Sequence, residues 1–195
     1  KDAKTLTVRD NGVGMSRDEV VANLGSLARS GTRRFLESLS GEQQADARLI
    51  GQFGVGFYSA FVVADKVTVL TRRADATAAE GVCWESDGQG EYSLAVEEIA
   101  TRGTSVILHL KEDDTEFLDH WKLRDLIRKY SDHVAFQIRM KRFKDGKSTG
   151  EWETVNDASA LWAKPKSEIT DDEYKAFYKS LGHDFHDPLV WAHNR

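Results

Sequence analysis

The chain has 195 residues, of which 40% are hydrophobic and 30% charged, and this balance is typical of a soluble globular protein with one fair-sized core. The formal net charge of −5 argues against nucleic-acid binding driven by overall charge. The single cysteine, Cys83, excludes an internal disulfide and fits a reducing cytosol, and the sequence has no long apolar segment that would predict a membrane span.

Short strands and short helices are predicted along the first half of the chain. Residues Thr5–Arg9 alternate polar and apolar side chains, as a half-buried strand does. Ser16 and Glu19 form a capping box, which predicts a helix that continues to Ala28. The elements expected next are helices at Arg33–Leu39 and Phe57–Val63, and strands at Lys66–Arg72, Val82–Ser86, Tyr92–Glu97 and Thr104–Leu110.

The second half is predicted to hold a long amphipathic helix, a hairpin and a final helix. The long helix spans Thr115–His133, and the hairpin joins strands at Val134–Phe143 and Glu151–Val155. A capping box of Thr170 and Glu173 opens the last helix. Strands followed by helices and more strands predict an α+β fold, a two-layer α/β sandwich with helices on one face of a mainly antiparallel sheet. The side chains predicted to face inward on the long helix are Phe117, Trp121, Ile127 and Tyr130.

Two glycine-rich turns are the most informative feature for function. They are Asp10-Asn11-Gly12-Val13-Gly14-Met15 and Gly51-Gln52-Phe53-Gly54-Val55-Gly56. Glycine lets the backbone take positive φ and approach a ligand, and a glycine turn that opens a helix points several amides at one place, which suits phosphate. Asp10 lies at the end of a strand, where it can accept hydrogen bonds from a ligand. Such a pair suits a nucleotide, with the base at one end and the phosphates at the other.

Neither turn matches the commoner nucleotide-binding motifs. A phosphate loop of the form G-x-x-x-x-G-K-[ST] is absent from the sequence. The dinucleotide fingerprint G-x-G-x-x-G also fails, because Arg17 stands where the last glycine is needed. Each turn alone is typical of a plain tight turn, and it is the pair that indicates a ligand site.

With these two turns the chain resembles the N-terminal ATP-binding domain of the heat-shock-90 chaperone family, in particular its bacterial HtpG type. The two-turn layout is shared with the wider GHKL (Bergerat-fold) ATPases, which include gyrase and histidine kinases. The run Gly56-Phe57-Tyr58-Ser59-Ala60 and the downstream segments favour the chaperone over a kinase. The matching segments are Asp10–Met15, Asn23–Gly25, Ser30–Thr32, Ile50–Phe61, Arg102–Thr104, Leu108–Asp113, Leu161–Trp162 and Ile169–Tyr174.

The resemblance implies an ATP site around the two turns. In it Asp10 accepts a hydrogen bond from the adenine amino group, Met15 lies against the purine, and Thr104 bonds to the base region through water. Asn23 contacts ribose or phosphate. The residues expected to line the site are Asp10, Gly14, Met15, Asn23, Leu24, Arg29, Ser30, Gly51, Gln52, Phe53, Gly54, Val55, Gly56, Phe57 and Thr104.

Several of these residues also have a plain structural interpretation, and Thr104, at the start of a strand, could be a simple strand former. Asp10 could act only as a turn-forming side chain, although the second glycine turn favours the ligand role. Met15 and Phe57 could belong to the core, and Asn23 could be an exposed helical residue. Arg29, which stands where many family members have Lys, is either a phosphate-binding cation or an exposed charge at a helix end.

The resemblance also implies segments that this chain does not carry. Family members have a strand and helices before the Asp10 turn, and one helix supplies the Glu that activates water and the Asn that helps hold magnesium. The chain starts at Lys1, without an initiator Met, so no catalytic residue and no metal ligand is assigned. The expectation is therefore a truncated piece that binds ATP or ADP with Mg²⁺ weakly or not at all, does not hydrolyse ATP, and self-associates.

Three parts are expected along the chain: a truncated N-terminal ATP-binding domain at 1–155, a linker at 156–168 and the start of the middle domain at 169–195. The function implied is that of a cytoplasmic ATP-dependent chaperone, in which ATP binding and hydrolysis drive closure of a lid at roughly 25–54 and the folding of client proteins. Its partners are clients and a second copy in a homodimer, and neither nucleic acid nor membrane. The rival interpretation is a non-catalytic protein-interaction module that has lost or weakened nucleotide binding.

Ligand-type side chains also gather in the run His183-Asp184-Phe185-His186-Asp187. A metal site is one interpretation, and a polar loop after the helix that ends at Gly182 is the other. The loop is favoured, because no cysteine supports the cluster and its spacing matches no standard metal-binding pattern.

Overall fold

The structure is a computed structural model that describes residues 3–25, 54–132, 134, 136–144, 147–157, 161, 166–182 and 186–192. It divides into two compact units, Lys1–Leu118 and Asp119–Arg195. We call them the first unit and the second unit and describe each by itself. The predicted domain and linker boundaries at 155 and 168 remain predictions.

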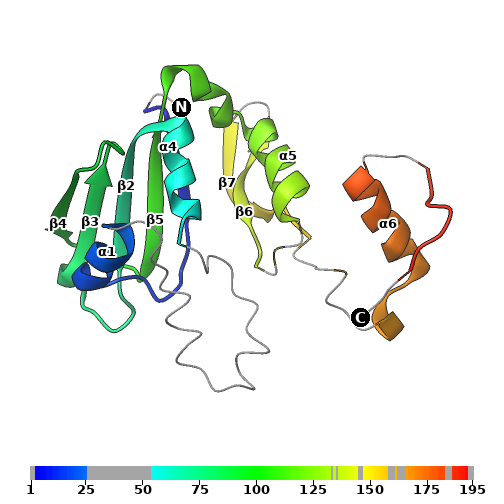
Figure 1. Ribbon diagram of the computed structural model, residues 1–195, viewed down its shortest axis with the longest axis horizontal. Helices are drawn as coiled ribbons and strands as arrows, with labels where there is room; N and C mark the ends of the chain where they lie inside the picture. Colours follow the sequence, from blue (N-terminus) through cyan, green and yellow to red (C-terminus); the bar gives the residue numbers. More distant parts are fainter. Residues whose placement is uncertain are drawn as a thin grey trace. The chain divides into compact units, whose positions relative to one another are not determined.

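A five-stranded antiparallel sheet forms the centre of the first unit, with strand order β1-β5-β2-β3-β4 (Figure 1). All five predicted strands are present, with small changes at their ends. Because β5 pairs with both β1 and β2, residues far apart in sequence meet in rows across these three strands. The strands are β1 (Thr5–Arg9), β2 (Ala64–Arg72), β3 (Gly81–Ser86), β4 (Tyr92–Glu97) and β5 (Gly103–Leu110).

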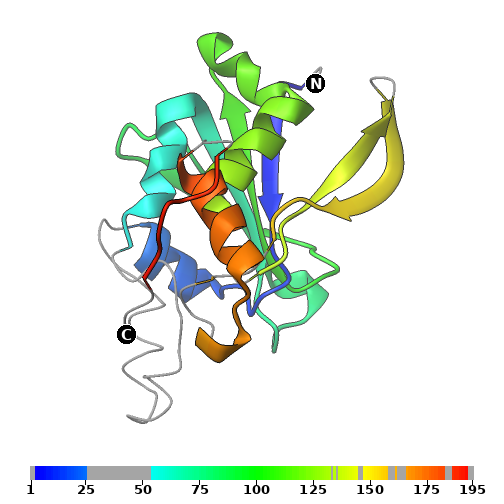
Figure 2. The same cartoon turned by 90° about the vertical axis from the view of Figure 1, so that its right-hand side faces the viewer.

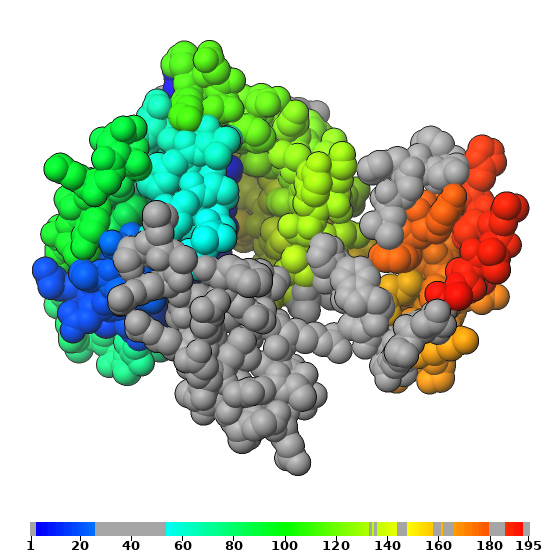
Figure 3. All heavy atoms as spheres, viewed as in Figure 1, coloured from blue at the N-terminus to red at the C-terminus, as the bar shows by residue number. Residues whose placement is uncertain are grey.

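Helices α1 (Arg17–Leu24) and α4 (Ala60–Val63) cover the same face of this sheet, as two perpendicular views agree (Figures 1 and 2). In the space-filling view they form blue and cyan parts of the near surface of the first unit (Figure 3). The 3-10 turn η1 (Gly56–Ser59) leads directly into α4, so the predicted helix at Phe57–Val63 has two halves. The predicted α+β fold, with helices on one face of an antiparallel sheet, is confirmed.

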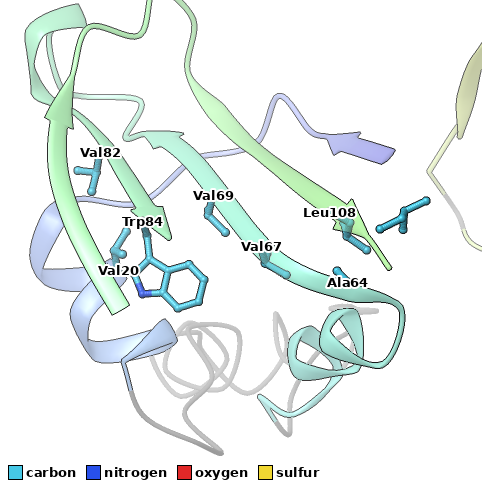
Figure 4. Packing of buried hydrophobic residues seen from close by; sticks show 8 residues of the cluster. Val20, Ala64, Val67, Val69, Val82, Trp84 and Leu108 are labelled. Atoms are coloured by element: carbon cyan, nitrogen blue, oxygen red, sulfur yellow. The ribbon is translucent and has the colours of Figure 1, made fainter. Parts of the chain in front are cut away.

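Apolar side chains at alternate positions of the strands point to the covered face and form the core beneath these helices. Val67 and Val69 of β2, Trp84 of β3 and Leu108 of β5 are buried on the covered face, where Val20 of α1 packs into the same cluster (Figure 4). Burying a side chain of this size typically contributes about 1.5–3 kcal/mol relative to leaving it in water. A one-residue slip in strand pairing would turn these side chains to the other face, so the apolar pattern fixes the register.

The long helix predicted at Thr115–His133 is interrupted at Asp119. A 3-10 segment, η3 (Glu112–Leu118), precedes the break, and α5 (His120–Ser131) follows it. The Asp119 carboxylate caps α5 by accepting a hydrogen bond from the Lys122 amide at 2.9 Å. Phe117 packs against the core, but the prediction that Trp121 and Tyr130 face inward is wrong, because both are exposed. Because α5 begins anew at Asp119, the apolar spacing before the break does not predict which side chains of α5 face inward.

The second unit contains α5 and a hairpin of β6 (Arg139–Lys144) and β7 (Lys147–Thr154). The Arg124 guanidinium of α5 bonds to the Glu153 carboxylate of β7 at 2.8 Å. Asn156 follows β7 and is buried, and its amide group donates to the carbonyls of Ser131 and Phe136. These bonds tie the end of α5 to the end of the hairpin.

A final helix, α6 (Asp171–Gly182), begins after the 3-10 turn η5 (Lys166–Glu168). The predicted capping box is present, because the Thr170 amide donates to the Glu173 carboxylate at 2.8 Å and the Glu173 amide donates to the Thr170 hydroxyl at 3.3 Å. In the part of the chain that the structure describes, no helix is both long and apolar enough to cross a membrane.

Candidate functional site

The first glycine turn is held against the end of the sheet by Asp10. Its amide donates to the Thr104 carbonyl at 2.9 Å, which extends the pairing of β1 with β5 by one residue. Its carboxylate oxygen Oδ1 accepts from the Gly12 amide at 2.8 Å and from the Thr104 amide at 3.3 Å. The side chain is exposed, and within the described residues the second oxygen, Oδ2, has no hydrogen-bond partner. The Asp10 carboxylate is therefore fixed through Oδ1, and Oδ2 is open to accept a further hydrogen bond.

Two glycines let this turn pack closely on the neighbouring strands. Gly14 has φ +66°, and a Cβ there would lie 2.0 Å from the Arg72 carbonyl oxygen. Gly103 has φ +108°, and its Cβ would lie 2.3 Å from the Asp10 carbonyl oxygen. Any side chain at either position would push the turn away from β2 or β5.

The buried hydroxyl of Thr71 contacts the first turn, the start of β5 and the side chain of Thr104. Thr71 is completely buried at the end of β2, and its Oγ1 accepts a hydrogen bond from the Met15 amide at 2.9 Å. The same oxygen lies 3.2 Å from the Gly103 carbonyl oxygen and 3.0 Å from the Thr104 hydroxyl. The first turn, the start of β5 and the side chain of Thr104 thus meet at one hydroxyl group.

An ion pair secures the helix that follows the turn. The Glu19 carboxylate accepts from the Ser16 amide at 2.8 Å, which completes the predicted capping box, and it also binds the Arg73 guanidinium. Burial would raise the pKa of Glu19, but the bonds to Arg73 and Ser16 outweigh it and leave this pKa below its ordinary value. The Ala74 amide adds a bond to the Val13 carbonyl at 2.8 Å. The loop after β2 is therefore fastened to both the turn and α1.

Two family models match this chain. One, described as "Histidine kinase-, DNA gyrase B-, and HSP90-like ATPase", matches residues 1–124, and the other, described as "Hsp90 protein", matches residues 141–195. This chain belongs to the histidine kinase-, DNA gyrase B- and HSP90-like ATPase family.

Bacterial relatives place this chain nearer to the HSP90 members of that family. It is 58% identical over 201 residues to "Chaperone protein HtpG" of Bordetella pertussis and 58% identical over 205 residues to the same-named protein of Alkalilimnicola ehrlichii. It is 57% identical over 197 residues to that of Cronobacter sakazakii. Each match covers 100% of this chain but only 31–32% of the relative, so the chain spans about a third of their length. The resemblance to the bacterial HtpG type is confirmed.

Asn23 and Leu24 lie in the last turn of α1. The Asn23 side-chain oxygen is buried, and within the described residues it has no hydrogen-bond partner. Such an orphaned acceptor is rare in folded proteins and fits a ligand that brings a donor, for example a hydroxyl group. The Leu24 side chain packs against the core, and its carbonyl accepts from the Tyr58 hydroxyl at 3.3 Å. Burial raises the pKa of Tyr58, so this group stays a hydrogen-bond donor.

The second glycine turn is described only from Gly54 onward. Gly54 has φ +66°, Val55 is exposed, and Gly56 begins η1. Phe57 is partly buried and packs edge-on against Trp84 of the core cluster, with ring centroids 5.6 Å apart. Its predicted place in the site remains a prediction.

The remaining predicted site residues lie outside the described part of the chain. They are Arg29, Ser30, Gly51, Gln52 and Phe53, together with the lid predicted at roughly 25–54 except for its two end residues. Among the described residues, the structure brings Asp10, Gly14, Met15 and Thr104 together at the end of the sheet. The site as a whole remains a prediction.

Sequence reasoning missed Thr71. On the covered face of the sheet β2 presents Val67, Val69 and Thr71, so a hydroxyl interrupts an apolar series. Thr104 interrupts the facing series of β5 in the same row, since the register pairs it with Thr71. Only the strand pairing of the folded sheet brings these two polar residues together.

In the described residues no group of three or more His, Cys, Asp or Glu side chains could hold a metal ion. The predicted cluster at 183–187 lies outside them except for His186 and Asp187. Asp187 pairs with Lys175 and Lys179 of α6, at 3.2 and 2.7 Å. The hydrogen bonds from Lys179 and Lys175 lower the pKa of Asp187. Two lysines close to this carboxylate disfavour a cation there.

Proposed function

We propose that this chain provides the adenine-binding part of an ATP-dependent molecular chaperone. The observation that carries the proposal is the Asp10 carboxylate, which is fixed through one oxygen and free to accept a hydrogen bond through the other. The family match and the HtpG-named relatives support the same proposal for the whole protein.

The chemistry of Asp10 selects among purine bases. An ionised carboxylate can only accept hydrogen bonds, so it matches the exocyclic amino group of adenine. A purine with a keto oxygen at that position would place two acceptors face to face, which leaves the bond unmade and a polar group unsatisfied. Asp10 would therefore favour ADP over a nucleotide with a 6-keto base.

Other groups would position the rest of the nucleotide. The side-chain oxygen of Asn23 would accept a hydrogen bond from a ribose hydroxyl, and Met15 would lie against one face of the base. The amides of the second glycine turn, including Gly54 and Gly56, would face the phosphates. Magnesium binds oxygen ligands in octahedral geometry, and among the described residues no group of three or more His, Cys, Asp or Glu side chains could hold a metal ion, so no step is assigned to it.

For the whole protein we propose the cycle implied by the resemblance. ATP binding closes a lid over the nucleotide, two copies meet, and hydrolysis resets the protein while clients fold. Lid closure over a nucleotide is a common gating device, because the closed lid completes the site and excludes water from it.

A titration of ADP followed by calorimetry tests the proposal. Asp10→Asn should weaken ADP binding at least about tenfold, because a charge-assisted hydrogen bond to a ligand usually contributes about 1.5–3 kcal/mol. Asp87→Asn is a matched control, since the Asp87 carboxylate makes the same kind of local turn bond, to the Gln89 amide at 2.9 Å.

The outcomes separate the proposal from its rival. Weaker binding for Asp10→Asn with unchanged binding for Asp87→Asn supports the adenine site. Unchanged affinity in both variants would show that Asp10 does not contact the base. A folded wild-type chain that gives no binding heat with ADP would favour the rival, a protein-interaction module without nucleotide binding.

A further inference from the structure

The covered face of the sheet changes from apolar to polar in a single step. One row across the strands contains Val106, Val69 and Trp84, and the next row toward the end of the sheet contains Thr104, Thr71 and Val82. Asp10 extends this second row through its amide bond to the Thr104 carbonyl. The two hydroxyl groups thus stand in line with the carboxylate that the proposed function places against adenine.

Hydrogen-bond counting fixes the roles of these hydroxyl groups. Thr71 has one proton and two lone pairs to share among three neighbours, and it has no access to water. The Met15 amide can only donate to it, at 2.9 Å, and the Gly103 carbonyl can only accept from it, at 3.2 Å. All three contacts are satisfied only when the Thr104 hydroxyl, 3.0 Å away, donates to Thr71.

We propose that Thr71 is a positioning residue for base selection, which acts by turning the hydroxyl proton of Thr104 inward. This inference rests on the proposed adenine site and deepens it. With its proton committed to Thr71, Thr104 presents only lone pairs to the ligand, beside the Asp10 carboxylate. The two residues then form a surface of acceptors, directly or through a bridging water, and that surface favours a base that carries an amino group over one that carries a keto oxygen.

Removing the Thr71 hydroxyl has two consequences. The Met15 amide loses its acceptor, so the turn that carries Asp10 is held less firmly. The Thr104 hydroxyl also loses its acceptor and is free to turn outward as a donor, which a keto oxygen can accept. A variant without this hydroxyl should therefore bind ADP more weakly and distinguish less between ADP and inosine diphosphate, whose base carries a keto oxygen in place of the amino group.

The test compares the wild-type chain with Thr71→Val, Thr71→Ser and Thr68→Val by calorimetric titration with each nucleotide and by thermal unfolding. Thr68 is a matched control because it lies on the same strand, is also buried, and faces the other side of the sheet. Its hydroxyl bonds to the Glu85 carboxylate at 2.7 Å and lies 3.1 Å from a ring nitrogen of His109, so its loss also costs stability.

Thr71→Val should lower ADP affinity about tenfold and reduce the ratio of ADP to inosine diphosphate affinity by a similar factor, as expected when a directed hydrogen bond is lost. Thr71→Ser keeps the hydroxyl and should restore both. Thr68→Val should unfold at a lower temperature with both affinities unchanged.

Four results would overturn the inference. If Thr71→Val binds ADP like the wild type, or binds both nucleotides more weakly by the same factor, Thr71 has only a structural role. If the wild-type chain is folded and binds no ADP, the proposed function fails and the inference falls with it. If Thr71→Val does not fold, Thr104→Val replaces it, and an unchanged ADP to inosine diphosphate ratio in that variant contradicts the inference.

Discussion

Gly14 shows how one residue type fixes the geometry of the site. Its φ of +66° is costly for any residue with a Cβ, and that Cβ would meet the Arg72 backbone. We expect Gly14→Ala to destabilise the first unit by about 2–5 kcal/mol, the sum of backbone strain and a clash that the strand cannot relieve. Urea unfolding measures this difference directly.

Gly90 provides a control that separates backbone strain from the steric clash. It also has positive φ, at +101°, but a Cβ there would meet nothing within 4 Å. Gly90→Ala should therefore cost only the backbone strain, about 1–2 kcal/mol. Equal losses in the two variants would mean that the close packing of Gly14 on β2 contributes nothing.

The site residues differ in how far the sequence could specify them. The residue pattern around Asp10 predicts a turn and an acceptor, because aspartate followed by glycines has strong local preferences. Thr71 has no local signal of this kind, since a threonine in a strand is usually a good strand former. Its role depends on the register with β5, which brings it beside Thr104, and register is a property of the folded sheet.

At the scale of elements, the ion pair between Glu19 and Arg73 joins α1 to the loop after β2. The pKa of Glu19 is lowered in the folded protein, so its contribution to stability is present above its unfolded pKa of about 4.5 and is lost as the pH falls through the folded value. Glu19→Gln keeps the capping hydrogen bond but not the charge. It should lower the free energy of unfolding by about 0.5–1 kcal/mol at neutral pH, and this gap should narrow as the pH falls below the unfolded pKa of Glu19 and through its lowered folded value.

A double-mutant cycle with Arg73→Gln checks that the gap comes from the pair. The double variant should be about as stable as Arg73→Gln alone, because Arg73→Gln already removes the pair with Glu19 together with the bond from Arg73 to Asp75. Additive losses, or a gap between wild type and Glu19→Gln that persists in acid, would show that Glu19 acts through its cap alone.

Helix starts that are marked by a local capping box could be predicted from the sequence. The break between η3 and α5 could not be predicted in this way. The boxes of Ser16 with Glu19 and of Thr170 with Glu173 are satisfied within a few residues, and both helices begin where expected. The break at Asp119 was missed, because the apolar spacing continues across it. As a result Trp121 was predicted to face inward although it is 63% exposed.

At the scale of the whole molecule, both edges of the sheet carry an exposed valine. Val8 of edge strand β1 is 62% exposed and Val96 of edge strand β4 is 69% exposed. Exposed edge strands offer unpaired backbone groups and apolar side chains to another copy of the chain. We expect a mass from light scattering that rises with concentration in the micromolar range, in line with the self-association predicted from the sequence.

Lysine substitutions test whether the edges cause this association. Val8→Lys combined with Val96→Lys should return the mass toward that of a monomer, because charge on an edge strand opposes pairing. Val62→Lys is the control, since Val62 is 70% exposed on α4 and lies on no sheet edge. A wild-type mass that does not change with concentration would contradict the prediction, as would equal effects of the edge and control variants.

In the proposed function, the turn at Asp10 binds the adenine base. The most direct test follows the backbone amide signals of this chain by NMR as ADP is added. The amides of Gly12, Met15 and Thr104, which bond to Asp10 or Thr71, should shift in a saturable way, and the Gln89 amide, which bonds to Asp87, should not. Saturable shifts that leave Gly12, Met15 and Thr104 unchanged and appear elsewhere would contradict the assignment of the adenine site.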